Sequence, residues 1–153
     1  MNGSLTNTAL NATLHCLTGC AIGEIAGLIL GTILGWSNLQ TVAAAIALAF
    51  LFGYALSLLP LTKAGLSFKQ AMPIVLAADT LSILTMEVVD NATVVVVPGA
   101  MDAGLVSPLF WSVLALSLFL AFWAAFPVNR LLLQRGKGHA LVHQYHHEGD
   151  HHA

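Results

Sequence analysis

The residues with the clearest chemical potential lie in an apolar segment near the N-terminus, HCLTGCAIGE. Cys16, Cys20 and Glu24 follow one another at four-residue spacing, so a helix places them on one face. His15 lies beside Cys16, about 100° around the helix. Thiolate and imidazole groups bind Zn, Cu(I) and related ions. We therefore predict a site for a transition metal, Zn or Cu, in which His15, Cys16 and Cys20 supply up to three ligands.

A second set of chemically active residues lies in the segment AADTLSILTMEVVDN. Asp79, Glu87 and Asp90 interrupt a run that is otherwise apolar enough to cross a membrane. An acid near the centre of a bilayer costs about 2.5 to 3.5 kcal/mol. Helical rotation places Met86 and Asp90 within about 40° of Asp79, with Glu87 at the edge of this face. We predict that this polar face points into the protein interior.

These intramembrane acids have no basic partner in the sequence at the same depth. Every Lys and Arg lies near one end of a predicted helix, so the acids must be protonated, hydrogen-bonded or neutralised by a cation from outside. Glu24 and Asp79 each lie about ten to twelve residues, or roughly 15 to 18 Å, from the same membrane face. We expect these two to form a midplane cation site, with Glu87 and Asp90 continuing the path outward.

The C-terminal segment is rich in histidine, and neutral imidazole groups can collect Zn, Cu or Ni ions. We predict that this tail exchanges metal ions with the cytoplasm. The candidate ligands are His139, His143, His146 and His147, followed by His151 and His152.

The composition requires a membrane to position these residues. Hydrophobic residues make up 58% of the 153 residues and charged residues only 8%, whereas soluble domains use about a quarter. A membrane-spanning helix needs about 20 apolar residues. We predict an all-α, polytopic integral membrane protein, a bundle of about four transmembrane helices, in contact with the lipid bilayer and without a nucleic-acid surface. The expected spans are residues 13–36, 40–61, 68–97 and 108–133, within a transmembrane domain of residues 1–138 and before a tail of residues 139–153.

The basic residues predict the orientation. Lys63 and Lys69 flank the second connection, and Arg130, Arg135 and Lys137 follow or end the fourth span. Since cytoplasmic segments carry an excess of Lys and Arg, we expect both termini in the cytoplasm, with the bundle in a bacterial inner membrane.

A ridge of glycines runs along the first predicted span. Gly19, Gly23, Gly27, Gly31 and Gly35 recur at every fourth position. Small residues at this spacing allow two helix backbones to approach closely. We expect the ridge to pack against another helix, either within the chain or in a homo-oligomer.

Three segments together resemble a known family of small bacterial membrane proteins: HCLTGCAIGE, ADTLSILTMEVVDN and PVNRLLLQRGKGHA. This family is the domain of unknown function DUF4396, and the resemblance covers nearly the whole chain. It implies about four spans in a bacterial membrane. It implies no activity, so the functional prediction depends on the residues.

The leading hypothesis is a protein, not an enzyme, that binds and translocates a transition-metal cation. One alternative is a membrane thiol redox enzyme that uses Cys16 and Cys20, although their CxxxC spacing needs favourable geometry for a disulfide. Another is a proton relay or accessory subunit of a larger complex, in which the acids carry protons. Haem binding ranks lower, because only His15 lies in or near a span, and a second axial ligand must come from Met86, another subunit or the tail.

Overall fold

The computed structural model describes residues 2–135, and these form an all-α fold of four long helices without a β-strand. The helices are α1 (Asn2–Leu34), α2 (Asn38–Lys63), α3 (Phe68–Val96) and α4 (Pro108–Gln134), and a short 3₁₀ helix, η1 (Ala100–Asp102), lies between α3 and α4. All four long helices are apolar and long enough to cross a membrane. The predicted fold class is confirmed.

The helices start at serines that the sequence places between the spans. Ser37 begins α2 by accepting from the Gln40 backbone N–H, while the Gln40 side chain accepts from the Ser37 backbone N–H at 3.0 Å. Ser107 caps α4, with Pro108 in the first helical turn, a position that suits proline. Gly35 follows the end of α1 with a φ of 65°, a left-handed conformation that glycine adopts without strain.

The first helix is longer than the sequence pattern predicts. It begins at Asn2 rather than near Thr13, because Ala9 and Ala12 are completely or almost completely buried against the bundle and this packing extends the helix. Its 33 residues span about 50 Å at 1.5 Å per residue, whereas the bilayer core is about 30 Å thick. The helix must therefore be tilted or project beyond the bilayer core.

The glycine ridge packs against α2 within the same chain. A side chain added at Gly19 would come within 2.7 Å of the Gly53 backbone, and one added at Gly27 within 2.5 Å of Ala45. One added at Gly23 would collide with the Ala49 backbone. The face that we considered for a homo-oligomer is thus covered by α2, since close backbone approach is already satisfied inside the chain.

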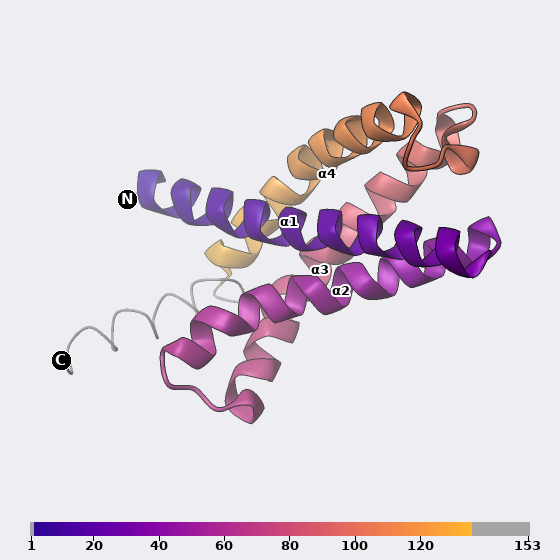
Figure 1. Cartoon of the computed structure of the whole chain (residues 1–153). Helices are drawn as coiled ribbons and strands as arrows, with labels where there is room; N and C mark the ends of the chain where they lie inside the picture. The colour runs from indigo at the N-terminus through magenta and orange to yellow at the C-terminus, as the bar shows by residue number, and fades with distance from the viewer. Residues whose placement is uncertain (1, 136–153) are drawn as a thin grey trace.

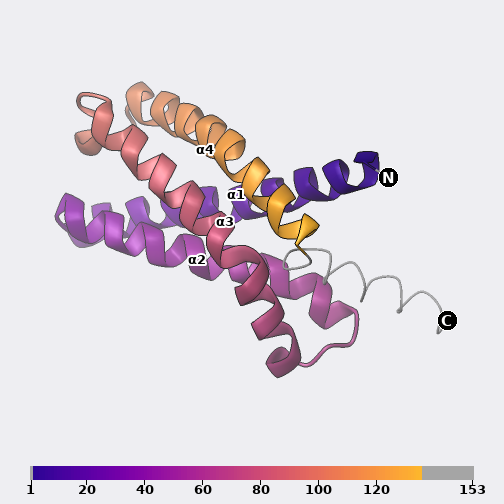
Figure 2. The same ribbon diagram turned by 180° about the vertical axis from the view of Figure 1, so that it is seen from behind.

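Two antiparallel helix pairs cross one another. Helices α1 and α2 lie side by side, and α3 and α4 form a second pair behind them (Figures 1 and 2). Most buried side chains between the helices are small or polar, with a few larger ones such as Ile83 and Met86, while large apolar side chains such as Ile33, Leu51 and Phe119 are exposed on the outside. An apolar outer surface around a more polar interior is typical of an integral membrane protein.

Candidate functional site

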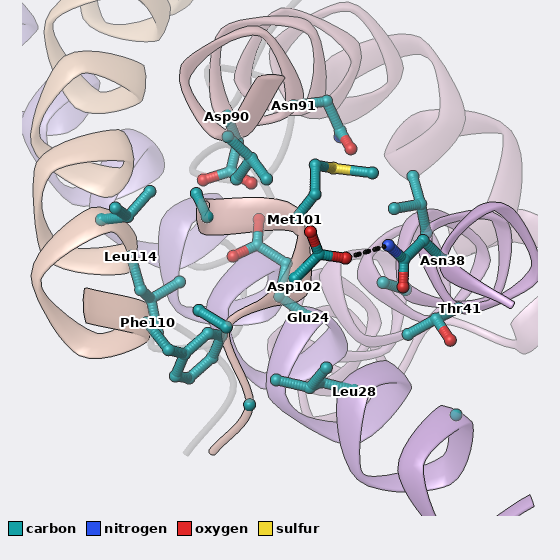
Figure 3. Close-up of a pocket in the computed structure, with 18 of the residues that line it drawn as sticks. Glu24, Leu28, Asn38, Thr41, Asp90, Asn91, Met101, Asp102, Phe110 and Leu114 are labelled. Atoms are coloured by element: carbon teal, nitrogen blue, oxygen red, sulfur yellow. Dashed lines mark hydrogen bonds between the residues drawn. The ribbon is translucent and has the colours of Figure 1, made fainter. Parts of the chain in front are cut away.

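A cavity of about 290 Å³ extends from the bundle interior to the turn between α1 and α2 and to η1. Three carboxyl groups line its deep part, those of Glu24 on α1 and of Glu87 and Asp90 on α3. A fourth, that of Asp102 in η1, lies near the outer end, where it accepts a hydrogen bond of 2.9 Å from Asn38 (Figure 3). Helices α1 and α3 and the short helix η1 thus bring four acids to one space.

The deep carboxyl groups are buried but incompletely hydrogen-bonded. Glu87 is 3% exposed and Asp90 6% exposed. The carboxyl groups of Glu24 and Asp90 neighbour one another, with Ser117 of α4 beside Asp90. Within the described chain, both Glu24 oxygens and one oxygen each of Glu87 and Asp90 have no hydrogen-bond partner. Buried acceptors of this kind are costly unless a proton, a water molecule or a cation satisfies them.

The described charged residues that line the cavity are all acidic. Among the described residues, its lining contains no Lys, Arg or His. The described basic residues lie at the opposite end of the bundle, where α2 ends, α3 begins and α4 ends; they are Lys63, Lys69, Arg130 and Arg135. The arrangement can therefore attract a cation and cannot neutralise its own carboxylates with a basic side chain.

Buried polar and sulfur-containing side chains continue from the cavity toward that opposite end. The Cys20 thiol Sγ lies 3.9 Å from Met86 Sδ. Further along, the Cys16 thiol lies 3.9 Å from Asp79 Oδ1. Cys16, Cys20, Met86 and Asp79 are each 1% exposed. The expected polar faces of the first and third spans therefore meet in the bundle interior.

The predicted pairing of Glu24 with Asp79 is wrong. Asp79 contacts Cys16, whereas Glu24 neighbours Asp90. Because Cys16 and Glu24 are separated by about 12 Å along α1, the two acids lie at different depths. The prediction assumed that residues equally far from their helix ends lie at equal depth. The crossing of α1 and α3 instead decides which residues of the two helices lie side by side.

His15 does not join the two cysteines. It is exposed, and its Nε2 lies 2.9 Å from the carbonyl oxygen of Leu56 on α2. That carbonyl lacks its usual helical donor, because residue 60 is a proline and has no N–H. His15 therefore completes the hydrogen bonding of α2, and the predicted three-ligand set of His15, Cys16 and Cys20 is not brought together.

The metal site expected from the sequence is not assembled within residues 2–135. No three His, Cys, Asp or Glu side chains in this part of the chain are arranged to hold a metal ion together. Both cysteines are free thiols. The predicted tail ligands His139, His143, His146 and His147 lie outside the described residues.

A family model, that of the domain of unknown function DUF4396, matches residues 6–138. The chain belongs to this family. No curated protein and no solved structure matches the chain. In this family member, the match begins within α1, covers the other three long helices in full, and includes both sets of buried acids and sulfur-containing residues.

Sequence reasoning missed the contribution of α4 in this family member. Ser117 and Asn129 are buried, at 0% and 3% exposure. Asn129 donates a hydrogen bond of 2.9 Å to the Thr13 hydroxyl of α1. The signal was present, because Ser117, Ala121, Ala125 and Asn129 recur at every fourth position and form a small, polar stripe on an otherwise bulky helix.

Proposed function

We propose that this chain binds a transition-metal cation, Zn or Cu in kind, and moves it across a bacterial inner membrane. The main support for the proposal is the acid-lined cavity. Several of its buried carboxyl oxygens have no hydrogen-bond partner in the described chain, and its described lining has no basic residue. A cation that enters this space supplies the missing partner and offsets the cost of burying the carboxylates.

The interior row of side chains supports a route beyond the cavity. From Glu24, Glu87 and Asp90 the ion passes to Cys20 and Met86, and then to Cys16 and Asp79. Each step offers an oxygen or sulfur ligand of a type that transition metals accept. No three His, Cys, Asp or Glu side chains within residues 2–135 are arranged in advance as one site, so each step offers only a few ligands, from which the ion can move on.

The charge distribution supports an orientation for this route. The basic end of the bundle faces the cytoplasm by the positive-inside rule, so both termini are cytoplasmic and the cavity opens outward. On this orientation the histidine-rich tail is cytoplasmic, and its proposed role is to exchange the ion with the cytoplasm.

A proton relay is the second candidate, and one observation favours it. Protons require no coordination geometry, and the neighbouring carboxyl groups of Glu24 and Asp90 form a chain along which a proton can pass. In this case the protein is a proton path or an accessory subunit rather than a metal carrier.

The test uses the full-length chain in proteoliposomes that enclose either a metal-sensitive dye or a pH-sensitive dye. Glu24→Gln and Asp90→Asn should each slow metal uptake by at least about tenfold, which corresponds to about 1.4 kcal/mol. The control is Thr18→Val, which changes an exposed polar side chain of α1 and should leave uptake unchanged.

The two candidates give different results in this assay. Metal uptake that depends on both acids supports translocation. If proton flux depends on both acids and no metal is taken up, the proton relay replaces metal translocation as the proposed function. Metal uptake that is unaffected by either substitution overturns the role of the cavity.

A further inference from the structure

Two sulfur atoms face one another directly beyond the deep end of the cavity. Cys20 Sγ of α1 and Met86 Sδ of α3 are 3.9 Å apart, and both side chains are 1% exposed. Met86 immediately precedes Glu87, whose carboxyl group lines the cavity and neighbours the Cys20 thiol. The sulfur pair is thus the next set of candidate ligands beyond Glu24 and Glu87 in the bundle interior.

The separation of the sulfur atoms suits an ion with three ligands. Metal–thiolate bonds in proteins are about 2.3 Å long. A thiolate bond of this length and a thioether bond of similar length that meet at about 120° place their sulfur atoms about 4.0 Å apart, close to the 3.9 Å observed. The third position then falls to Glu87, which is 3% exposed and has one oxygen without a partner in the described chain.

The chemistry of these ligands selects a class of ion. Thiolate and thioether sulfur favour soft ions such as Cu(I). Structural Zn sites instead use four ligands drawn from Cys, His, Asp and Glu. A group of four such residues does not occur here within residues 2–135, and thioether sulfur is absent from the usual ligands of Zn.

We propose that Cys20, Met86 and Glu87 form a three-coordinate site that selects a soft monovalent cation, Cu(I) or its analogue Ag(I). This inference rests on the proposed function and narrows its cargo. As the metal–sulfur bond forms, the Cys20 thiol releases its proton to solvent, so one proton leaves for each ion that binds. The ion keeps its charge and no electron is transferred, so copper must arrive already reduced.

The alternative is that Cys20 and Met86 contribute only to packing and bind no ion. Buried Cys and Met side chains commonly act as adaptable hydrophobic residues. Under that alternative, conservative substitutions leave ion binding unchanged, whereas a ligand role predicts a selective loss of Ag(I) binding.

The experiment measures Ag(I) and Zn(II) binding to purified full-length protein in detergent, by calorimetry and by the ultraviolet absorption of the metal–thiolate bond. The variants are Cys20→Ser and Met86→Leu, the second of which nearly conserves volume. We expect each to weaken Ag(I) binding at least about tenfold and to leave the weaker Zn(II) binding unchanged. Met72→Leu makes the same change on α3 about 21 Å along the helix from Met86 and should bind as the wild type does.

The outcomes separate this inference from the proposed function. Unchanged Ag(I) binding in both variants, or Zn(II) that competes equally for the same site, overturns the soft-ion site even if proteoliposomes still take up Zn(II). Tight Ag(I) binding that depends on Cys20 and Met86 supports the site, even if no metal crosses the membrane and the transport proposal fails.

Discussion

His15 Nε2 on α1 lies 2.9 Å from the carbonyl oxygen of Leu56 on α2, the one carbonyl that Pro60 leaves without its helical N–H donor. Because a carbonyl can only accept, His15 donates with Nε2. His15, which we predicted to be a metal ligand, thus supplies the hydrogen-bond donor that α2 lacks at Leu56.

This relationship predicts the effect of removing the imidazole. His15→Ala should lower the free energy of unfolding by about 0.5 to 1.5 kcal/mol, the usual net value of a hydrogen bond. In a Pro60→Ala background, residue 60 regains its N–H, and the same substitution should cost almost nothing. Thermal unfolding of the four proteins in detergent measures this cycle. An equal cost in both backgrounds would show that His15 acts in another way.

The contact between Gly23 and Ala49 predicts that the α1–α2 pair tolerates no side chain at its crossing. Gly23→Ala would place a methyl group against the Ala49 backbone, and overpacking of this kind costs about 1 to 3 kcal/mol. Gly3→Ala is the matched control, because nothing lies within 4 Å of the added carbon and alanine favours the helix. Unfolding midpoints should fall for the first variant only. Equal midpoints would contradict the close approach of the helices.

The hydrogen bond between Asn38 and Asp102 predicts that the outer end of the cavity is held together by one side-chain contact. Asn38→Ala removes the donor, whereas Asp102→Asn keeps an acceptor oxygen and removes the charge. Loss of about 1 kcal/mol corresponds to roughly fivefold more frequent local opening. Amide hydrogen exchange of residues 100–104 should therefore accelerate about fivefold in Asn38→Ala and less in Asp102→Asn. Unchanged exchange in both would mean that η1 is held by other contacts.

The pairing of Thr13 with Asn129 predicts a cost that depends on both partners. Thr13→Val leaves the buried Asn129 amide without its acceptor, which costs about 1 to 3 kcal/mol. A double variant that adds Asn129→Leu removes both polar groups, so its loss of unfolding free energy should be smaller than the sum of the two single losses. Strict additivity in chemical or thermal unfolding would argue against the interaction.

Much of the architecture was accessible from sequence. Apolar length and scarce charge predict four spans, and the structure confirms four helices long and apolar enough to cross a membrane. Four-residue spacing also predicts that Cys16 and Cys20 share a face with Glu24, and both cysteines and the Glu24 oxygens are buried. Only the start of α1 differs markedly, and Ala9 and Ala12 of this additional segment are buried against the bundle.

The sequence by itself determined which side chains share a face of each helix, because the rise and rotation per residue are constant within a helix. Only the tertiary structure decided which residues meet across helices. The crossing of the two helix pairs brings Glu24 to Asp90 rather than to Asp79, turns His15 toward Leu56, and places Ser117 and Asn129 of α4 beside the buried acids and Thr13. Those contacts depend on crossing angle and backbone distance, which follow from the packing of two surfaces together and are not encoded in the spacing of either one.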